Sequence, residues 1–206
     1  MIVENTSDKI VKRMLKHDII DDKESAIYSY HIQVILEAAV GHAILLSLAS
    51  LTGHFIEILL FLLSFDILRG STSGYHCKTN VGCLILSTIA CSTVVLLENL
   101  ALSHILYCQG GVIMSMIFII LVGAVNHPNM GWSDEELKAA KKSSRVKILV
   151  LFLFLSVLDC LGIEKRYLYC FGMGIIQCSI SLVLVHFSRK GASCKIKTDS
   201  SAKGEW

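Results

Sequence analysis

The chain has 206 residues, of which 53% are hydrophobic and 17% charged, with a single proline. This composition predicts a polytopic, all-α membrane protein. The formal net charge of +2, with no basic stripe interleaved with aromatic residues, argues against a nucleic-acid partner. Most of the eight cysteines lie inside apolar runs, where cysteine behaves as a small hydrophobe, so we expect no disulfide framework.

An amphipathic helix is predicted over residues 7–20, with Thr6 or Ser7 as its N-cap. Its apolar residues recur at helical spacing, and its basic residues lie on the other side. We expect this helix to lie on the membrane surface, as a separate region comprising residues 1–24. The N-terminus has no short apolar core followed by a small-residue cleavage site, so it does not have the pattern of a signal peptide.

Six apolar runs follow, each approaching the roughly 20 residues that a bilayer helix needs. A break at Thr52-Gly53 separates the first two, the third begins about a turn early, near Thr79, and Ser133 with Glu136 forms a capping-box pattern before the fifth. We expect a six-helix membrane bundle at 25–187 and a basic, disordered tail at 188–206. The predicted spans are 25–50, 51–68, 84–97, 106–125, 146–163 and 167–187.

The distribution of lysine and arginine predicts the orientation of this bundle. The N-terminus, the tail and the loop before the fifth span hold five each, and the central loop holds Arg69 and Lys78. In a six-span arrangement these four regions share one side of the membrane. The positive-inside rule therefore predicts that both termini and the central segment are cytoplasmic.

The polar segment 69–83, between the second and third spans, contains a candidate catalytic pair, His76 and Cys83. A cysteine and a histidine together can make a thiolate nucleophile. On one uninterrupted helix the two would be separated by roughly 10 Å of rise, so the chain must fold back, which Gly74 and Gly82 permit. Because the apolar run resumes directly after Cys83, we expect this residue at or near a helix N-terminus, where the helix dipole favours the thiolate.

Other interpretations of this segment remain open. It can be a polar loop in which His76 and Cys83 are close by coincidence, and the adjacent Cys77 is a second candidate nucleophile. These three side chains could also be read as metal ligands, but no CxxC or HxxxH pattern accompanies them, so we expect no metal site. Arg69 either anchors a helix end at the membrane interface or binds a peptide carboxylate.

Charged residues within or beside the spans supply further candidates. We expect Glu37 to be protonated or paired within the bundle, and Asp66 either to orient His76 as a third catalytic member or to pair with Arg69. The run Lys138 to Lys147 is either a membrane anchor that contacts anionic lipids or a docking surface for an acidic peptide. The other acidic candidates are Glu57 and Asp159, and the histidines expected to be ordinary core or interface residues are His31, His42, His54, His104 and His186.

The central segment resembles that of the AgrB family, the membrane cysteine peptidases of bacterial accessory gene regulator quorum sensing. The resemblance rests on the pattern Arg-x4-Gly-x-His-x6-Cys, formed here by Arg69, Gly74, His76 and Cys83. The flanking apolar runs, the amphipathic N-terminal helix and the basic loop at 126–147 extend it over nearly the whole chain. One departure is Cys77, where the family usually has a small residue that is not a nucleophile.

The resemblance implies that His76 is the general base and Cys83 the nucleophile in cleavage of an AgrD-like propeptide near its acidic C-terminal part. The product would be a thioester on Cys83 that an internal Cys or Ser converts into a thiolactone or lactone ring, without a cofactor. Implied substrate-binding residues are Arg69, Gly74, Lys141 and Lys142, in a bacterial cell membrane and with a homo-oligomer as one arrangement. The alternatives are a small-solute transporter, which would depend on Glu37 rather than Cys83, and a non-enzymatic scaffold that needs neither.

Overall fold

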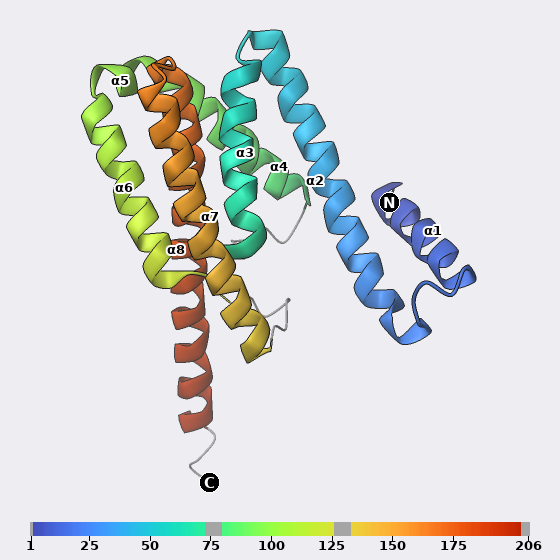
Figure 1. Ribbon diagram of the computed structural model, residues 1–206. Helices are drawn as coiled ribbons and strands as arrows, with labels where there is room; N and C mark the ends of the chain where they lie inside the picture. The colour runs from blue at the N-terminus through green and yellow to red at the C-terminus, as the bar shows by residue number, and fades with distance from the viewer. Residues whose placement is uncertain (1, 73–79, 126–132, 203–206) are drawn as a thin grey trace.

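The computed structural model describes residues 2–72, 80–125 and 133–202, and all regular structure within them is helical (Figure 1). This agrees with the predicted all-α membrane bundle. A short 3-10 helix at Asp22–Glu24 precedes the second α-helix. The α-helices are α1 (Ile2–Lys16), α2 (Ser25–Thr52), α3 (Phe55–Thr72), α4 (Asn80–Leu96), α5 (Glu98–Ser103), α6 (Ile105–Val122), α7 (Asp134–Cys160) and α8 (Lys165–Ala202).

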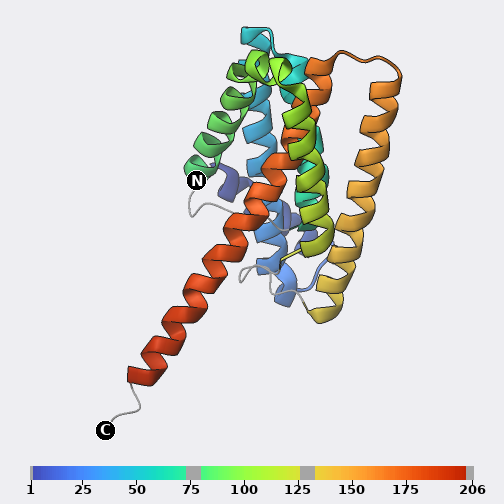
Figure 2. The same ribbon diagram turned by 90° about the vertical axis from the view of Figure 1, so that its left-hand side faces the viewer.

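Helix α8 is the central element of the bundle, and α3, α6 and α7 pack around its first half (Figures 1 and 2). Its buried residues Phe171, Ile175 and Leu182 form one core with residues of α3, α6 and α7. A second core lies where α2, α3, α4 and α8 meet, around Phe61 and Cys170. Helix α1 packs on α2, apart from both cores, whereas the second half of α2 contributes to the second core (Figure 1).

Small residues allow α3 and α8 to approach closely. A Cβ atom at Gly174 would lie 2.4 Å from the Phe61 carbonyl oxygen and 2.0 Å from Ser64 Oγ, so only glycine fits there. The Ser64 hydroxyl donates to the Phe171 carbonyl across the interface at 2.7 Å. Such contacts between small residues are a usual way for helices to associate in a bilayer, where apolar burial alone gives no preference for protein over lipid.

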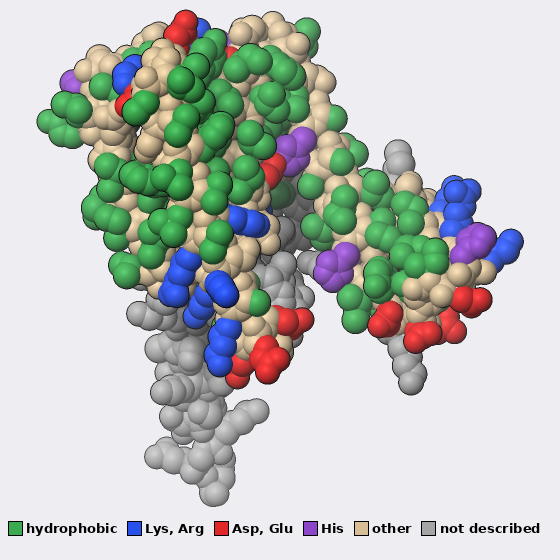
Figure 3. Space-filling model, viewed as in Figure 1, with side chains coloured by type: hydrophobic (Ala, Val, Ile, Leu, Met, Phe, Trp, Pro, Cys, Tyr) green, Lys and Arg blue, Asp and Glu red, His purple; other side chains and the backbone are tan. Residues whose placement is uncertain are grey.

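The lengths and compositions of the helices fit a membrane protein. Among the described residues, three helices are long and apolar enough to cross a bilayer, namely Ser25–Thr52, Ile105–Val122 and Lys165–Val185, and Gly82–Leu96 is a shorter apolar helix. Large apolar side chains cover the outer surface of the bundle (Figure 3). The prediction of six crossings stays a prediction, because α3 and α7 carry several charged residues.

The boundaries of α1 differ from those predicted. The helix begins at Ile2, so neither Thr6 nor Ser7 is its N-cap, and Ser7 is instead a buried residue within the helix. It ends at Lys16 rather than Ile20, because Asp18 adopts a left-handed conformation with φ 52°. The Ile19 N–H then donates to the Met14 carbonyl at 3.0 Å, which closes the helix end as a Schellman motif.

The other boundaries follow the sequence signals more closely. The turn between α2 and α3 forms where predicted, at Gly53, whose φ of 79° suits glycine. Ser133 and Glu136 form the predicted capping box, which starts α7 at Asp134, twelve residues before the expected apolar span. The tail is helical through Ala202 rather than disordered from residue 188, since each added residue of a formed helix gains a backbone hydrogen bond.

Substitution of Gly174 tests the close approach of α3 and α8. We expect Gly174→Ala to force the helices apart and to destabilise the protein by about 1–3 kcal/mol, the usual cost of overpacking. Gly110→Ala on α6 is the matched control, because nothing lies within 4 Å of its added Cβ, and we expect it to be neutral or slightly stabilising. Thermal midpoints of the detergent-purified variants compare them, and equal midpoints would contradict this packing.

Candidate functional site

Cys83 lies in the first turn of α4, as its fourth residue, which confirms the predicted position near a helix N-terminus. Its thiol is free and half-buried. The other members of the predicted motif, Gly74 and His76, and the alternative nucleophile Cys77 lie outside the described residues. The site can therefore be described from the helix that bears Cys83 and from the helix end that leads into the central segment.

The end of α3 fixes the position at which the chain enters the central segment. The Thr72 carbonyl accepts a hydrogen bond from the Val125 N–H at 3.2 Å, just beyond the end of α6. The Thr72 hydroxyl lies 3.4 Å from Cys178 Sγ on α8 and also donates to the Leu68 carbonyl. Contacts to α8 and to the segment that follows α6 thus hold the last residue of α3, which is fully buried.

Arg69 lies in the last turn of α3, where a positive charge complements the helix dipole. Its guanidinium donates to Ser181 Oγ on α8 at 3.4 Å and lies over the Phe65 ring, 5.3 Å from its centroid. The side chain therefore crosses to α8 at the same end of α3 as Thr72. This arrangement supports a role as a helix-end anchor, while binding of a peptide carboxylate stays a prediction.

The basic residues of α7 lie on the part of the helix near its N-terminus (Figure 3). Lys141 is half-buried against Gly123 at the end of α6, and Lys142 is exposed. Lys147 reaches the last turn of α3, because its Nζ lies 4.0 Å from the Cβ position of Gly70. Lys141 and Lys142 are the lysines expected to bind substrate, whereas the lysine that the fold brings next to the helix turn of Arg69 is Lys147.

The acidic candidates Glu57 and Asp159 form ion pairs at the opposite end of the bundle, and Glu98 shares the arginine that pairs with Glu57. Glu57 and Glu98 are only 4% and 8% exposed, and both contact the Arg166 guanidinium, with 3.0 Å between Arg166 Nε and Glu98 Oε1. This buried cluster joins the beginnings of α3, α5 and α8. Asp159 pairs with Lys165 in the more exposed turn between α7 and α8. Each of these carboxylates thus has a structural ion-pair partner, and all of them lie at the end of the bundle away from Cys83.

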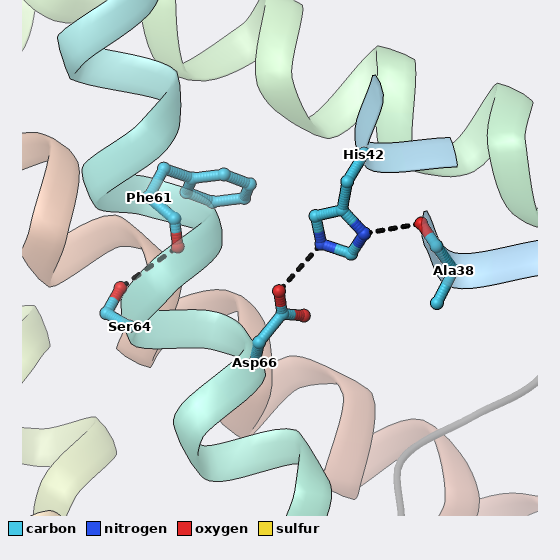
Figure 4. A network of polar contacts seen from close by, with 5 residues as sticks. All are labelled: Ala38, His42, Phe61, Ser64 and Asp66. Carbon is cyan, nitrogen blue, oxygen red and sulfur yellow. Dashed lines mark hydrogen bonds and ion pairs between the residues drawn. The ribbon is translucent and has the colours of Figure 1, made fainter. Parts of the chain in front are cut away.

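The remaining acidic candidates have partners nearer the middle of the bundle. Glu37 accepts a hydrogen bond from the neutral side chain of Gln33 at 2.8 Å within α2, and its pairing with another part of the bundle stays a prediction. Asp66 Oδ2 lies 2.6 Å from His42 Nε2 on α2, and His42 Nδ1 donates to the Ala38 carbonyl at 2.6 Å (Figure 4). The sequence analysis expected Asp66 to meet His76 or Arg69, so its contact with His42 was not predicted.

The register of the α2–α3 hairpin could have revealed this pair. His42 precedes Gly53 by eleven residues, and Asp66 follows it by thirteen. In two antiparallel helices joined at a tight turn, residues at nearly equal distances from the turn lie at the same level. The pair was not predicted, because His42 was expected to be an ordinary core or interface residue.

A cavity of about 250 Å³ lies between α6, α7 and α8, away from Cys83. Its lining includes Gln109, Phe152 and Met173, and Asp159 is the one acidic candidate from the sequence that lines it. Within the described ranges, no three His, Cys, Asp or Glu side chains are grouped so that they could hold a metal ion.

Comparison with known proteins decides the family. The family model described as Accessory gene regulator B matches residues 7–182, which include the whole central segment and α4. The chain belongs to the AgrB family. No curated protein and no solved structure matches it.

Membership of the AgrB family gives this membrane protein a role in processing the autoinducer of the accessory gene regulator system. It implies peptidase-like activity and, in general, an AgrD-like propeptide as the partner. The resemblance stated from the central segment is thereby confirmed at the level of the family. The catalytic roles of individual residues are a separate question, because the match assigns none.

The two ion-pair sites at the far end of the bundle make a matched test of burial. We expect Arg166→Gln to destabilise the protein by about 3–5 kcal/mol, because it leaves buried carboxylates without a counter-charge. Lys165→Gln removes the partner of the more exposed Asp159 and should cost less than about 1 kcal/mol. Thermal midpoints in detergent compare the variants, and equal losses would show that the Arg166 cluster is not what joins α3, α5 and α8.

Proposed function

We propose that this chain is a membrane cysteine endopeptidase that cleaves an AgrD-like propeptide, with Cys83 as the nucleophile and His76 as the general base. The observation that carries the proposal is the placement of Cys83 in the first turn of α4, directly after the segment that bears His76. The spacing of His76 and Cys83 requires the chain to fold back between them, and because α4 begins at Asn80 and includes Gly82, this turn has to precede α4 rather than lie at Gly82. The family match over residues 7–182 supports this reading.

The reaction proceeds in two acyl transfers. His76 takes the proton of the Cys83 thiol, whose sulfur attacks the carbonyl carbon of the scissile peptide bond. The carbon–nitrogen bond breaks, the leaving amine of the C-terminal fragment takes the proton from His76, and the N-terminal portion remains on Cys83 as a thioester. An internal Cys thiol or Ser hydroxyl of the bound peptide then attacks that thioester, which closes the ring and releases Cys83.

Ring closure by this route needs no nucleotide. Exchange of one thioester for another conserves the acyl–sulfur bond, so thiolactone formation costs little free energy. The competing reaction is hydrolysis, and a site within the bundle limits it by excluding water from the thioester. The half-buried position of Cys83 in α4 fits this requirement.

The basic residues near the end of α3 would bind the acidic C-terminal part of the precursor. Arg69 and Lys147 lie on neighbouring turns of α3 and α7, with Lys141 and the exposed Lys142 further along α7. Their charges attract an acidic peptide, and the Arg69 guanidinium can bind a carboxylate through two hydrogen bonds. Gly74 would leave room for the peptide backbone beside His76.

The location proposed for this site is the cytoplasmic face of the bacterial cell membrane, with both termini on the same side. The end of α6, the beginning of α7 and the end of α8 lie toward one end of the molecule, and α1 lies beside the half of α2 nearer that end (Figures 1 and 2). The turns at Gly53 and Gly162 and helix α5 lie toward the other end. This distribution of basic residues supports the orientation expected from the positive-inside rule.

A processing assay tests the proposal. A tagged AgrD-like precursor is co-expressed with wild type or a single variant, and release of the C-terminal fragment is measured. We expect His76→Ala and Cys83→Ser to reduce release by at least a hundredfold, because each removes a group needed for the attack. Cys77→Ser, Glu37→Gln and Cys160→Ser, which alters an exposed thiol at the other end of the bundle, should retain at least half the wild-type release.

The variants separate the alternatives. Release by Cys83→Ser with loss in Cys77→Ser would make Cys77 the nucleophile. Dependence on Glu37 with no need for Cys83 would favour a transporter, and processing that no variant alters would mean that another protein cleaves the precursor.

A further inference from the structure

The His42–Asp66 pair lies where α2 separates from the bundle. On the Gly53 side of His42, Leu45 and Ala49 of α2 are buried against the second core. On its other side, residues 38–40 are exposed, and α2 diverges from α3 (Figure 1). The pair is thus a polar bridge between α2 and α3 at the point where the two helices separate (Figure 1).

The geometry of the bridge requires a shared proton. The Ala38 carbonyl only accepts hydrogen bonds, so His42 Nδ1 carries a hydrogen (Figure 4). The 2.6 Å contact between His42 Nε2 and Asp66 Oδ2 needs one more proton between the two atoms. The pair is therefore an imidazolium with a carboxylate, or a neutral imidazole with a protonated carboxyl. Both forms have no net charge, which suits a membrane bundle.

The same turn of α2 lies close to the helix that carries Cys83. A Cβ atom added at Gly41, the residue before His42, would lie 4.0 Å from Cδ1 of Leu84, which directly follows Cys83 as the fifth residue of α4. On α3, Asp66 lies one turn before Arg69. The bridge therefore joins α2 to α3 at the level where α2 packs near the beginning of α4.

We propose that His42 and Asp66 are positioning residues for Cys83. By holding α2 on α3, the bridge places the surface at Gly41 near which α4 begins, and so sets where the Cys83 sulfur lies relative to the substrate. The inference rests on the proposed function of Cys83. His42 and Asp66 act through the backbone position of α4 and take no part in the acyl transfers.

The kinetic test separates catalysis from binding. In purified membranes with a synthetic precursor, we expect His42→Ala and Asp66→Ala to lower kcat at least tenfold and to change KM less than twofold, because a displaced nucleophile still meets bound substrate. Asp66→Asn should retain at least half of kcat, since its amide can donate to a neutral His42 and preserve the bridge. His31→Ala, which removes a comparable bond to the carbonyl four residues earlier in α2, is the control and should leave kcat unchanged.

A second readout reports the position of α4 without any peptidase activity. In a Cys83→Ser background, Gly41→Cys and Leu84→Cys are joined with a short bifunctional methanethiosulfonate reagent, and the bridged peptide is measured by mass spectrometry. We expect the yield to fall at least fivefold with His42→Ala or Asp66→Ala and to persist with Asp66→Asn.

Each other outcome overturns the inference. An unchanged yield would show that the bridge does not position α4, and a reduced yield with unchanged kcat would show that this position does not matter for catalysis. Equal losses in Asp66→Asn and Asp66→Ala would assign the pair a charge-dependent role. If wild type fails to process the precursor while the crosslink behaves as expected, the proposed function has failed, and the bridge is then only a structural clamp.

Discussion

The close approach of α3 and α8 at Gly174 is the constraint on which the rest of the structure depends. Because no side chain separates the helices there, the Ser64 hydroxyl reaches the Phe171 carbonyl, and the same register brings Thr72 to Cys178 and Arg69 to Ser181 at the end of α3. The chain therefore enters the central segment from a fixed point on α8. A site built on this segment takes its position from the contact between two backbones.

Two of the ionisable clusters in the part of the bundle that the structure describes have different uses. Glu57, Glu98 and Arg166 form a buried ion cluster that joins three helix beginnings at one end. His42 and Asp66 form a more exposed bridge, with side chains 33% and 43% exposed, where α2 leaves the bundle. The first group closes the end of the bundle away from Cys83, whereas the second lies where α2 and α3 separate, close to the helix that carries Cys83.

The sequence could predict features set by local signals. Cys83 at a helix start follows from the apolar run that resumes after it, and the capping box at Ser133 from its residue types. It could not predict that Arg166 meets Glu57, because 109 residues separate them and only packing decides which carboxylate an arginine reaches. The end of α1 was misplaced because Asp18 adopts a conformation usually taken by glycine. His76 lies outside the described residues, so its predicted position relative to Cys83 stays a prediction.

The central claim is that Cys83 carries the acyl group, and the most direct measurement is the intact mass of the protein after brief incubation with the precursor. The account predicts a covalent adduct equal in mass to the N-terminal portion of the precursor, located on Cys83 by fragmentation and removed by neutral hydroxylamine, as a thioester would be. It should form in Cys77→Ser and be absent from Cys83→Ala. An adduct on Cys77, or one that persists in Cys83→Ala, would contradict the account.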